Sequence, residues 1–275
     1  MSLIYAKLPD GSTNPAWLEA RRGRITASEV YRLMSGRADV RGTYMRDLLT
    51  ERLVGVLGEQ KVTEAMQAGI DREATAAKRY EEETGHSLIQ GYWIWDEKMG
   101  FGGTPDYIVT DGGGVEIKCP QPRNAIAARF SAALGAKWRE EQAYYWQCAG
   151  YRLLTGEPWW DLGVYSQELK DVGLDMYIDR APTNKADDDL LLDSVFEANA
   201  ILTKAYDEAL SPKRLWVEKT LIPAIERAQS HEAIQELENE VYKLGPGALP
   251  PAMIKAIDAA IRQKTTSLPS PLMGG

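Results

Sequence analysis

The segment of residues 101–120, FGGTPDYIVTDGGGVEIKCP, constrains the fold of this chain most strongly. Two short apolar runs flank its Asp-Gly-Gly-Gly turn, and glycine tolerates the positive φ that tight turns require, so the segment predicts a β-hairpin. Side chains alternate along a strand, and Glu116 and Lys118 therefore share one face. Ile117 and Cys119 point to the opposite face, which we expect to be buried.

The charged face of this hairpin indicates metal chemistry. Asp106 and Glu116 offer the hard carboxylate oxygens that Mg²⁺ or Mn²⁺ prefers, and Lys118 beside them could orient or deprotonate an attacking water. Pro-Asp followed by Glu-x-Lys is similar to the pattern of the PD-(D/E)xK metal-dependent nucleases. The alternative interpretation is an ordinary hairpin with a solvated Glu-Lys pair. The remainder of the chain decides between the two.

The composition indicates a globular protein. The chain has 275 residues, of which 44% are hydrophobic, so it can bury a sizeable core in one large or two small domains. No run approaches the ~18 consecutive apolar residues of a membrane span, and the first residues lack the charged and apolar regions of a signal peptide. We therefore expect a cytoplasmic protein without membrane segments. Cys119 and Cys148 lack zinc-ligand spacing and are expected to be reduced, buried thiols.

Charge is distributed unevenly along the chain. The 32 basic and 40 acidic residues give a net charge of −8, whereas nucleic-acid-binding proteins are usually basic. Residues 21–46 nevertheless contain seven arginines against two acidic residues, and residues 187–240 contain thirteen acidic against five basic residues. Such a polarised chain can still steer a polyanion to one face.

A phosphate site is predicted in the basic N-terminal region. Thr26 or Ser28 could cap a helix that ends before Gly36. A helix N-terminus with a hydroxyl and nearby arginines favours an anion, because free N–H groups and the helix dipole both attract negative charge. Trp17 and Ile25 are expected to be core residues rather than contact residues.

A second helix is predicted over residues 63–83, with Gly85 at the position where a left-handed residue ends helices. Glu73 lies on this helix among small residues, and a helix surface rich in alanine can approach a sheet closely. Of the acidic residues on this helix, Glu73 is therefore the one expected to face the hairpin.

The other elements alternate between strands and helices. Tyr144, Gln147 and Tyr151 lie three and four residues apart on one helix and share a stripe, which is either a polar wall of a cleft or a half-buried packing face. The expected elements are a strand at 88–95, helices at 124–134 and 138–154, strands at 160–166 and 173–179, and a helix at 187–210.

This order of elements predicts an α/β (α+β) fold in which helices flank one central mixed β-sheet. No internal repeat is visible in the sequence. We expect one domain at residues 1–210 and a helical C-terminal extension at residues 211–275, whose end is a flexible tail rich in proline and glycine.

Five segments together resemble the family of phage lambda exonuclease and the related YqaJ-like viral recombinase exonucleases, within the PD-(D/E)xK superfamily. They occur in the family's order between residues 17 and 179, and they read WLEARRGRITASEV, GIDRE, GGTPD, GVEIKCP and YYWQCAGY. Any one motif is weak, but RxGxITAS combined with Pro-Asp and ExKCP in this order is specific, because independent matches multiply. The segment after Ser211 is not covered by the resemblance.

The resemblance implies a catalytic role for five residues. Asp106, Glu116 and the backbone carbonyl of Ile117 match the metal ligands of the family. Lys118 matches the residue that positions or activates the attacking water. Glu73 matches a helical carboxylate near the metals.

The resemblance also implies contacts with DNA. Arg21 and Ser28 match the positions that bind the 5′-phosphate of the DNA end. Thr104 stands where phage lambda exonuclease has serine, and it keeps a hydroxyl. The positions expected to line the active site are Asp96, Thr104, Tyr144 and Gln147.

The implied activity is that of a Mg²⁺-dependent 5′-to-3′ exonuclease, with Mn²⁺ as the other possible ion. The enzyme would degrade one strand of linear double-stranded DNA from 5′-phosphorylated ends and leave 3′ overhangs for phage-type recombination in the cytoplasm of a bacterial host. Family members form toroidal trimers, so we expect a homotrimer, with a single-strand annealing protein as a further partner. Two alternatives stay open: another PD-(D/E)xK endonuclease or junction resolvase, and a non-catalytic module that binds DNA ends or an annealing partner.

Overall fold

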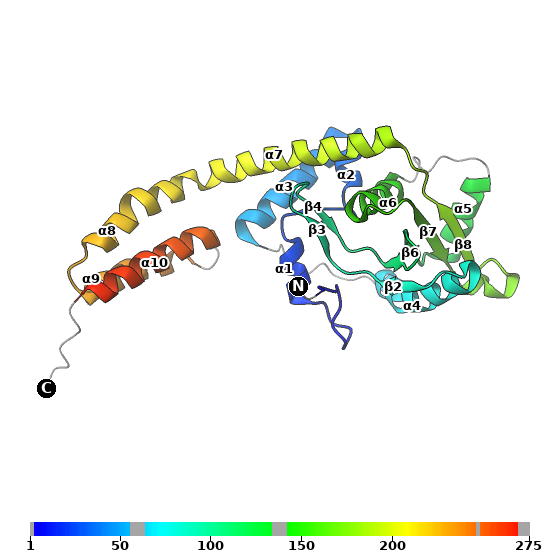
Figure 1. The fold of residues 1–275 in the computed structure, drawn as a ribbon, viewed down its shortest axis with the longest axis horizontal. Coiled ribbons are helices and arrows are strands. Elements are labelled where there is room, and N and C mark those ends of the chain that lie inside the picture. Colours follow the sequence, from blue (N-terminus) through cyan, green and yellow to red (C-terminus); the bar gives the residue numbers. More distant parts are fainter. Residues whose placement is uncertain (1–2, 56–63, 134–141, 246–247, 269–275) are drawn as a thin grey trace. The chain divides into compact units, whose positions relative to one another are not determined.

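The computed structural model describes residues 3–55, 64–133, 142–245 and 248–268 (Figure 1). Helices flank mixed β-sheets, as the predicted α/β (α+β) class requires. The chain forms two compact units, Met1–Leu48 with Gly58–Ala200 and Leu49–Leu57 with Ile201–Gly275. The helix α7, Lys185–Trp216, is continuous through residue 210. Separate domains at residues 1–210 and 211–275 therefore stay a prediction.

A five-stranded mixed sheet forms the centre of the first unit. Its strand order is β2-β5-β6-β7-β8, in which β6 and β7 are parallel and the other neighbours are antiparallel. The strands β5 and β6 form the predicted hairpin, with Tyr107 opposite Val115. The bounds are β2 Leu88–Gln90, β5 Tyr107–Val109, β6 Gly114–Lys118, β7 Trp160–Tyr165 and β8 Met176–Arg180.

The turn of this hairpin depends on glycine. Gly112 and Gly113 have φ of 99° and 84°, a region that residues with a Cβ rarely adopt. A Cβ on Gly113 would also lie 2.3 Å from the ring of Trp159. The Asp-Gly-Gly-Gly run is therefore required both by the turn and by its packing, and it fixes the register that positions Glu116.

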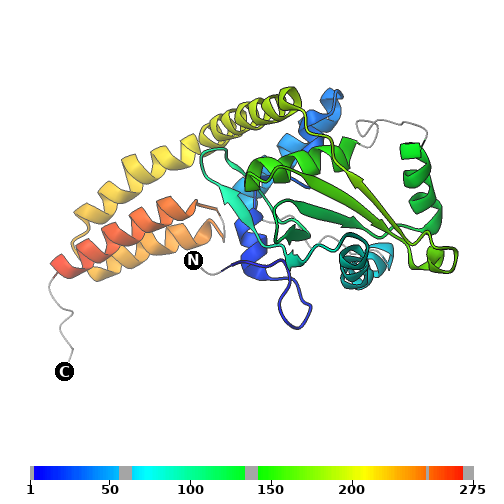
Figure 2. The same cartoon turned by 45° about the vertical axis from the view of Figure 1, so that its right-hand side comes forward.

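Helices cover both faces of the five-stranded sheet. On one face, Ala76, Ala77 and Tyr80 of α4 pack against Val115 and Ile117, so small residues allow the predicted close approach. The opposite face is covered by α5 and α6, and the two views show α4 and α6 on opposite sides of the sheet (Figures 1 and 2). These helices are α4 Glu64–Thr84, α5 Pro122–Ala133 and α6 Gln142–Thr155.

The first unit contains a second sheet that the sequence analysis did not predict. Its order is β1-β4-β3, with β1 parallel and β3 antiparallel to β4. The single strand predicted at 88–95 is wrong, because it divides between the two sheets at Gly91, where a Cβ would lie 1.7 Å from the carbonyl oxygen of Pro105. The bounds are β1 Ile25–Thr26, β3 Ile94–Asp96 and β4 Phe101–Gly103.

A helix ends before Gly36 as predicted, but its predicted start and its cap by Thr26 or Ser28 are wrong. Thr26 belongs to β1, and Ala27 continues the ladder by donating its N–H to the carbonyl of Gly102 at 2.9 Å. The helix α2 begins at Tyr31, has four residues and has no side-chain cap. The N-terminal helices are α1 Pro15–Arg21, α2 Tyr31–Met34 and α3 Ala38–Val54.

Other predicted boundaries agree with the structure. Gly85 and Gly156 follow the ends of α4 and α6 with φ of 74° and 72°. The start of the helix predicted at 138–154 lies outside the described residues, and α6 is seen from Gln142. Cys148 is buried, Cys119 is half-buried, and both carry free thiols. Within the described ranges, no helix is long and apolar enough to cross a membrane.

The second unit is helical and has its own apolar core. The core is built from Val217, Leu221, Ile225, Leu249 and Ile257 among others. The predicted flexible tail lies mainly outside the described residues, although positions 265–267 belong to the last helix. The elements that follow α7 are η3 Val217–Leu221, α8 Ile222–Arg227, α9 His231–Lys243 and α10 Pro251–Ser267.

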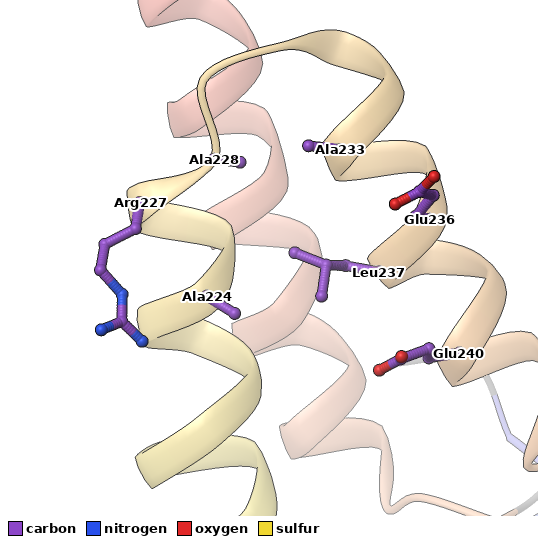
Figure 3. A pocket seen from close by; sticks show the side chains of 7 residues that line it. All are labelled: Ala224, Arg227, Ala228, Ala233, Glu236, Leu237 and Glu240. Atoms are coloured by element: carbon purple, nitrogen blue, oxygen red, sulfur yellow. The ribbon is translucent and has the colours of Figure 1, made fainter.

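A groove runs between α8 and α9 (Figure 3). Alanines and Leu237 form its apolar floor, Glu236 and Glu240 project from α9, and Arg227 projects from α8. The groove is therefore apolar inside and charged at its rims. Its lining residues are Ala224, Arg227, Ala228, Ala233, Glu236, Leu237 and Glu240.

Candidate active site

Glu116 is a buried carboxylate on strand β6, with only 2% of its surface exposed. Its Oε1 accepts hydrogen bonds from Lys118 Nζ at 2.5 Å and from Gln147 Nε2 at 2.7 Å. Its Oε2 is buried without a hydrogen-bond partner among the described residues. Burial of an unpaired carboxylate oxygen is costly, so this atom indicates a position that a cation or a hydrogen-bond donor would fit.

Asp106 lies next to Glu116, immediately before strand β5. Its Oδ2 accepts a hydrogen bond from the backbone N–H of Ile117 at 2.7 Å. The ladder between β5 and β6 ends at Tyr107 and Val115, so Ile117 lies beyond it. An extended residue directs its N–H and C=O to the same edge of the strand. The carbonyl of Ile117 therefore points to the same side as Asp106.

The carboxylates of Glu73, Asp106 and Glu116 form a cluster, in which they repel one another. Burial raises the pKa of Asp106 well above its usual value, and the nearby Glu116 raises it further. Glu73 on α4 has its pKa raised first by burial and then by Glu116, so Glu73 lies within electrostatic range of Glu116. Burial alone would lower the pKa of Lys118, but Glu116 and Asp106 outweigh it and raise that pKa. One ammonium thus faces three carboxylates.

The donor set fits a hard divalent cation. Such ions prefer carboxylate and carbonyl oxygens, and they usually keep several waters. Asp106, Glu116 with its unpaired Oε2, and the carbonyl of Ile117 supply three oxygens of this kind. Among the described residues, no group of three or more His, Cys, Asp or Glu side chains could hold a metal ion. Any ion here would therefore need backbone, water or substrate oxygens as well.

Residues of helix α6, which packs on one face of the sheet, contact Lys118 and Glu116. The Lys118 ammonium lies 5.3 Å from the centre of the Tyr144 ring, a cation–π distance. Gln147 Nε2 also donates to the hydroxyl of Tyr151 at 3.2 Å, and that hydroxyl donates to the carbonyl of Thr104 at 2.9 Å. Buried hydrogen bonds thus fix the stripe of α6 beside Glu116, and its role as a wall of the active site stays a prediction.

Arg21, Ser28 and Thr104 approach one edge of the second sheet. The strands β1 and β4 are parallel, so the residues that follow them, Ser28 and Thr104, leave the sheet at the same end. Thr104 Oγ1 accepts a hydrogen bond from Trp17 Nε1 at 2.8 Å, and the Arg21 guanidinium carbon lies 4.5 Å from the Trp17 ring centre. Ser28 is exposed, and its hydroxyl lies 3.4 Å from that of Thr26.

Most of the seven N-terminal arginines are engaged within the protein. The guanidinium of Arg24 lies 4.4 Å from the centre of the Trp95 ring. The ion pairs are Arg22 with Glu19, Arg32 with Asp47, Arg37 with Asp39, and Arg41 with Glu197. The basic run is therefore a weaker anion-binding surface than its sequence suggests, and Arg21 stands apart from the others.

Asp96 is not placed with the other candidate residues. It pairs with Phe101 at the start of β4, whereas Thr104 and Asp106 follow the end of that strand. Its Oδ1 accepts a hydrogen bond from the N–H of Met99 at 2.8 Å, which stabilises the turn between β3 and β4. The structure therefore shows a local role for this side chain in the turn, and its place in the active-site lining stays a prediction.

Two residues of the site were not among the predicted site residues. Tyr151 was recognised only as part of a stripe, although its spacing of four from Gln147 indicates a shared helix face. Trp17 was assigned to the core, but it is half-buried and contacts both Arg21 and Thr104. The spacing of four between Trp17 and Arg21 on α1 could have indicated that contact.

This chain is similar to known proteins in sequence and in structure. Residues 16–158 match the family described as YqaJ-like viral recombinase domain. An alkaline exonuclease from Laribacter hongkongensis, LHK-Exo, is similar in structure, with a TM-score of 0.63 and 31% identity over 73% of this chain and 98% of that chain. The same exonuclease in complex with dAMP gives a TM-score of 0.65 with 29% identity over 73% and 98% of the two chains.

A phage-related exonuclease from Haemophilus somnus 129PT shares the fold, with a TM-score of 0.55 and 14% identity over 71% of this chain and 99% of that chain. No curated protein sequence matches the chain. The matched family segment contains the paired carboxylates, Lys118, Gln147 and the Arg21–Trp17 pair, so it encloses the whole cluster described above. The chain belongs to the YqaJ-like viral recombinase domain family.

Proposed function

We propose that this protein is a metal-dependent deoxyribonuclease of the exonuclease type. It degrades one strand of linear double-stranded DNA from 5′-phosphorylated ends in the 5′-to-3′ direction and leaves 3′ overhangs for phage-type recombination. The observation that carries the proposal is the buried, unpartnered Oε2 of Glu116, a carboxylate whose Oε1 accepts from Lys118 and which lies close enough to Asp106 to raise its pKa. Membership of the family and the likeness to LHK-Exo support it.

The metal would be held by Asp106, Glu116 and the carbonyl of Ile117. When bound, Mg²⁺, or Mn²⁺ in its place, polarises a phosphoryl oxygen and lowers the pKa of a bound water. Lys118 has three donors, of which one is used by Glu116 Oε1, so the others can orient the attacking water or stabilise charge on the phosphate. Gln147 holds the Glu116 carboxylate in its orientation.

The direction of digestion would be set by binding of the 5′-phosphate at the DNA end. Arg21 supplies a charged, planar donor for a 5′-phosphate, and the hydroxyls of Ser28 and Thr104 supply two further donors. Thr104 is two residues from Asp106, so a phosphate held at this edge places the following nucleotide near the carboxylates. The chain thus combines an end-binding group with a hydrolytic group.

Digestion of linear and covalently closed circular duplexes tests this function. With Mg²⁺, the linear duplex should disappear and the closed circle should persist, and chelator should stop the reaction. A nicked or linearised circle would instead favour an endonuclease or junction resolvase of the same superfamily. Binding of DNA ends without any digestion would favour a non-catalytic module.

The assembly and partners follow from the same proposal. A homotrimer would enclose the duplex, and light scattering should then give three times the chain mass of 30.6 kDa.

We further propose that the groove between α8 and α9 binds a single-strand annealing protein. Charge reversal at Glu236 and Glu240 in the full chain should weaken this binding while digestion is unchanged. The work would take place in the cytoplasm of a bacterial host.

A further inference from the structure

We propose that Trp17 is a positioning residue that couples recognition of the DNA 5′-phosphate to the catalytic carboxylates. The inference rests on the proposed function and deepens it, because it names the side chain that holds the end-binding groups in place. Trp17 would act through Arg21 on one side and through Thr104 on the other.

The first contact is the stack between Trp17 and Arg21. Both residues lie on α1, four positions apart, so they share a face of the helix. The guanidinium carbon of Arg21 lies 4.5 Å from the ring centre. Among the described residues, no ion pair or hydrogen bond is seen for this guanidinium. The ring therefore orients the plane of Arg21 while its N–H edge stays available for a phosphate.

The contrast with a neighbouring residue supports this reading. Arg22 forms an ion pair with Glu19 at 2.5 Å, one turn back on the same helix. Its charge is thus partly compensated by a direct ion pair, whereas Arg21 lies within electrostatic range of Glu29 without forming an ion pair with it and has an aromatic ring beneath it. An aromatic ring orients a guanidinium without neutralising it, which is the requirement for an anion-binding arginine.

The second contact joins Trp17 to the catalytic cluster. Trp17 Nε1 donates to Thr104 Oγ1 at 2.8 Å, which fixes the rotation of the indole ring. The carbonyl of the same residue, Thr104, accepts a hydrogen bond from Tyr151. Thr104 is therefore held on both its side chain and its backbone, two residues before Asp106.

The network then continues to Glu116. Tyr151 is 1% and Gln147 6% exposed, and Gln147 donates both to the Tyr151 hydroxyl and to Glu116 Oε1. Hydrogen bonds in a buried network have few alternative partners, so the positions of its members depend on one another. A continuous set of contacts thus links the ring under Arg21 to the carboxylate that would bind metal.

Trp17 has two separable properties, its ring and its N–H group. Trp17→Phe keeps an aromatic ring under Arg21 but removes the donor to Thr104. Trp17→Leu removes both. Thr104→Val removes the acceptor with little change of shape, and Thr104→Ser keeps it. The chain also offers a control, Trp159, whose ring lies 3.9 Å from the guanidinium carbon of Arg180 in a similar stack.

The experiment measures kcat/KM on linear duplexes with a 5′-phosphate and with a 5′-hydroxyl, using the full chain with Mg²⁺. The ratio of the two values is the end preference, and a general folding defect lowers both values without changing the ratio. Trp17→Phe should reduce the preference roughly tenfold, the scale expected for one lost hydrogen bond. Trp17→Leu should abolish the preference, and Trp159→Phe should leave it unchanged.

A double-mutant cycle separates the hydrogen bond from general packing. The variant with both Trp17→Phe and Thr104→Val should lose no more preference than Thr104→Val alone, because both changes remove the same bond. Thr104→Ser should retain the parental preference. Additive losses in the double variant would show that Trp17 acts by packing and would overturn the inference.

Failure of the inference is distinguishable from failure of the proposed function. A parent enzyme that prefers phosphorylated ends, together with a Trp17→Phe variant of equal preference, overturns the role of Trp17 alone. A parent enzyme without any preference for phosphorylated ends overturns end recognition and the role of Trp17 together. If Trp17→Phe does not fold, Trp17→Tyr, which also keeps an aromatic ring and lacks the indole N–H, takes its place in the same comparison.

Discussion

Gln147 Nε2 and Glu116 Oε1 lie 2.7 Å apart, so a residue of helix α6 holds a carboxylate of strand β6 in a fixed orientation. Because Gln147 and Lys118 both use Oε1, the second oxygen of Glu116 keeps its lone pairs for another partner. The helix thereby determines which oxygen of the carboxylate is engaged within the protein.

Removal of this helix contact should impair catalysis. Gln147→Leu has a similar volume but lacks the donor, so Glu116 should lose its fixed orientation. We expect digestion of linear duplex DNA to slow by about 10- to 100-fold, as when a residue supporting a metal ligand is lost. Gln235→Leu, on the exposed surface of α9, is the matched control and should retain the parental rate. An unchanged rate in Gln147→Leu would show that Glu116 needs no such support.

Lys118 should be essential to the chemical step. Lys118→Ala removes the ammonium that faces Glu116 and Asp106, and with it the stabilisation of charge on the phosphate. Digestion rates should fall by roughly 10²- to 10⁴-fold. Lys170→Ala, an exposed residue, serves as the control. If Lys118→Ala digested DNA as fast as the parent, the assignment of this cluster as the catalytic centre would be wrong.

The excess of carboxylates predicts a pH-dependent stability of the metal-free protein. The pKa values of Asp106 and Glu73 are raised by folding. Their stabilising contribution is therefore fully present below their unfolded pKa values, about 3.9 and 4.3, and is lost as the pH rises through the raised folded values. Asp106→Asn should remove much of this loss of stability at higher pH.

Thermal melts in chelator across a pH series measure this effect. At neutral pH, Asp106→Asn should melt higher than the parent, by roughly 2–4 °C for each kcal/mol of relieved repulsion. Added Mg²⁺ should raise the melting temperature of the parent and have little effect on Asp106→Asn. Asp111→Asn, in the exposed hairpin turn, should behave like the parent. A lower melting temperature for Asp106→Asn would contradict the electrostatic account.

Two adjacent arginines should differ in their effect on end preference. Arg21 stacks on Trp17, whereas Arg22 is paired with Glu19. Arg21→Ala should abolish the preference for 5′-phosphorylated over 5′-hydroxyl ends, and Arg22→Ala should leave it nearly unchanged. Both substrates are digested by each variant under the same salt conditions, because phosphate contacts are sensitive to salt. Equal effects of the two substitutions would indicate a diffuse basic surface instead of a specific site.

Local patterns in the sequence predicted much of the fold. The Asp-Gly-Gly-Gly turn predicted the hairpin, and the glycines after α4 and α6 predicted the ends of those helices. The pairing of Glu116 with Lys118 followed from their alternation on one strand. These features depend on glycine positions and on spacing within a few residues, both of which can be read from the sequence.

The errors arose where distant segments decide the structure. Ala27 extends a strand because Gly102, 75 positions away, accepts its N–H, so the hydroxyls nearby do not cap a helix. The strand predicted at 88–95 divides because Gly91 passes close to the carbonyl of Pro105. Trp17 appeared to be a core residue because its partner Thr104 lies 87 positions away. No local pattern contains these contacts.

Digestion of end-labelled linear duplex DNA examines both halves of the assignment, hydrolysis at the Asp106–Glu116 cluster and end recognition at Arg21. The duplex carries one label at a 5′-phosphorylated end and a different label at the 3′ end of the same strand, and Mg²⁺ starts the reaction. We predict that the 5′ label is released first as mononucleotide, while the 3′ label stays in a shortening strand. Early release of the 3′ label, or of labelled internal fragments, would contradict the account.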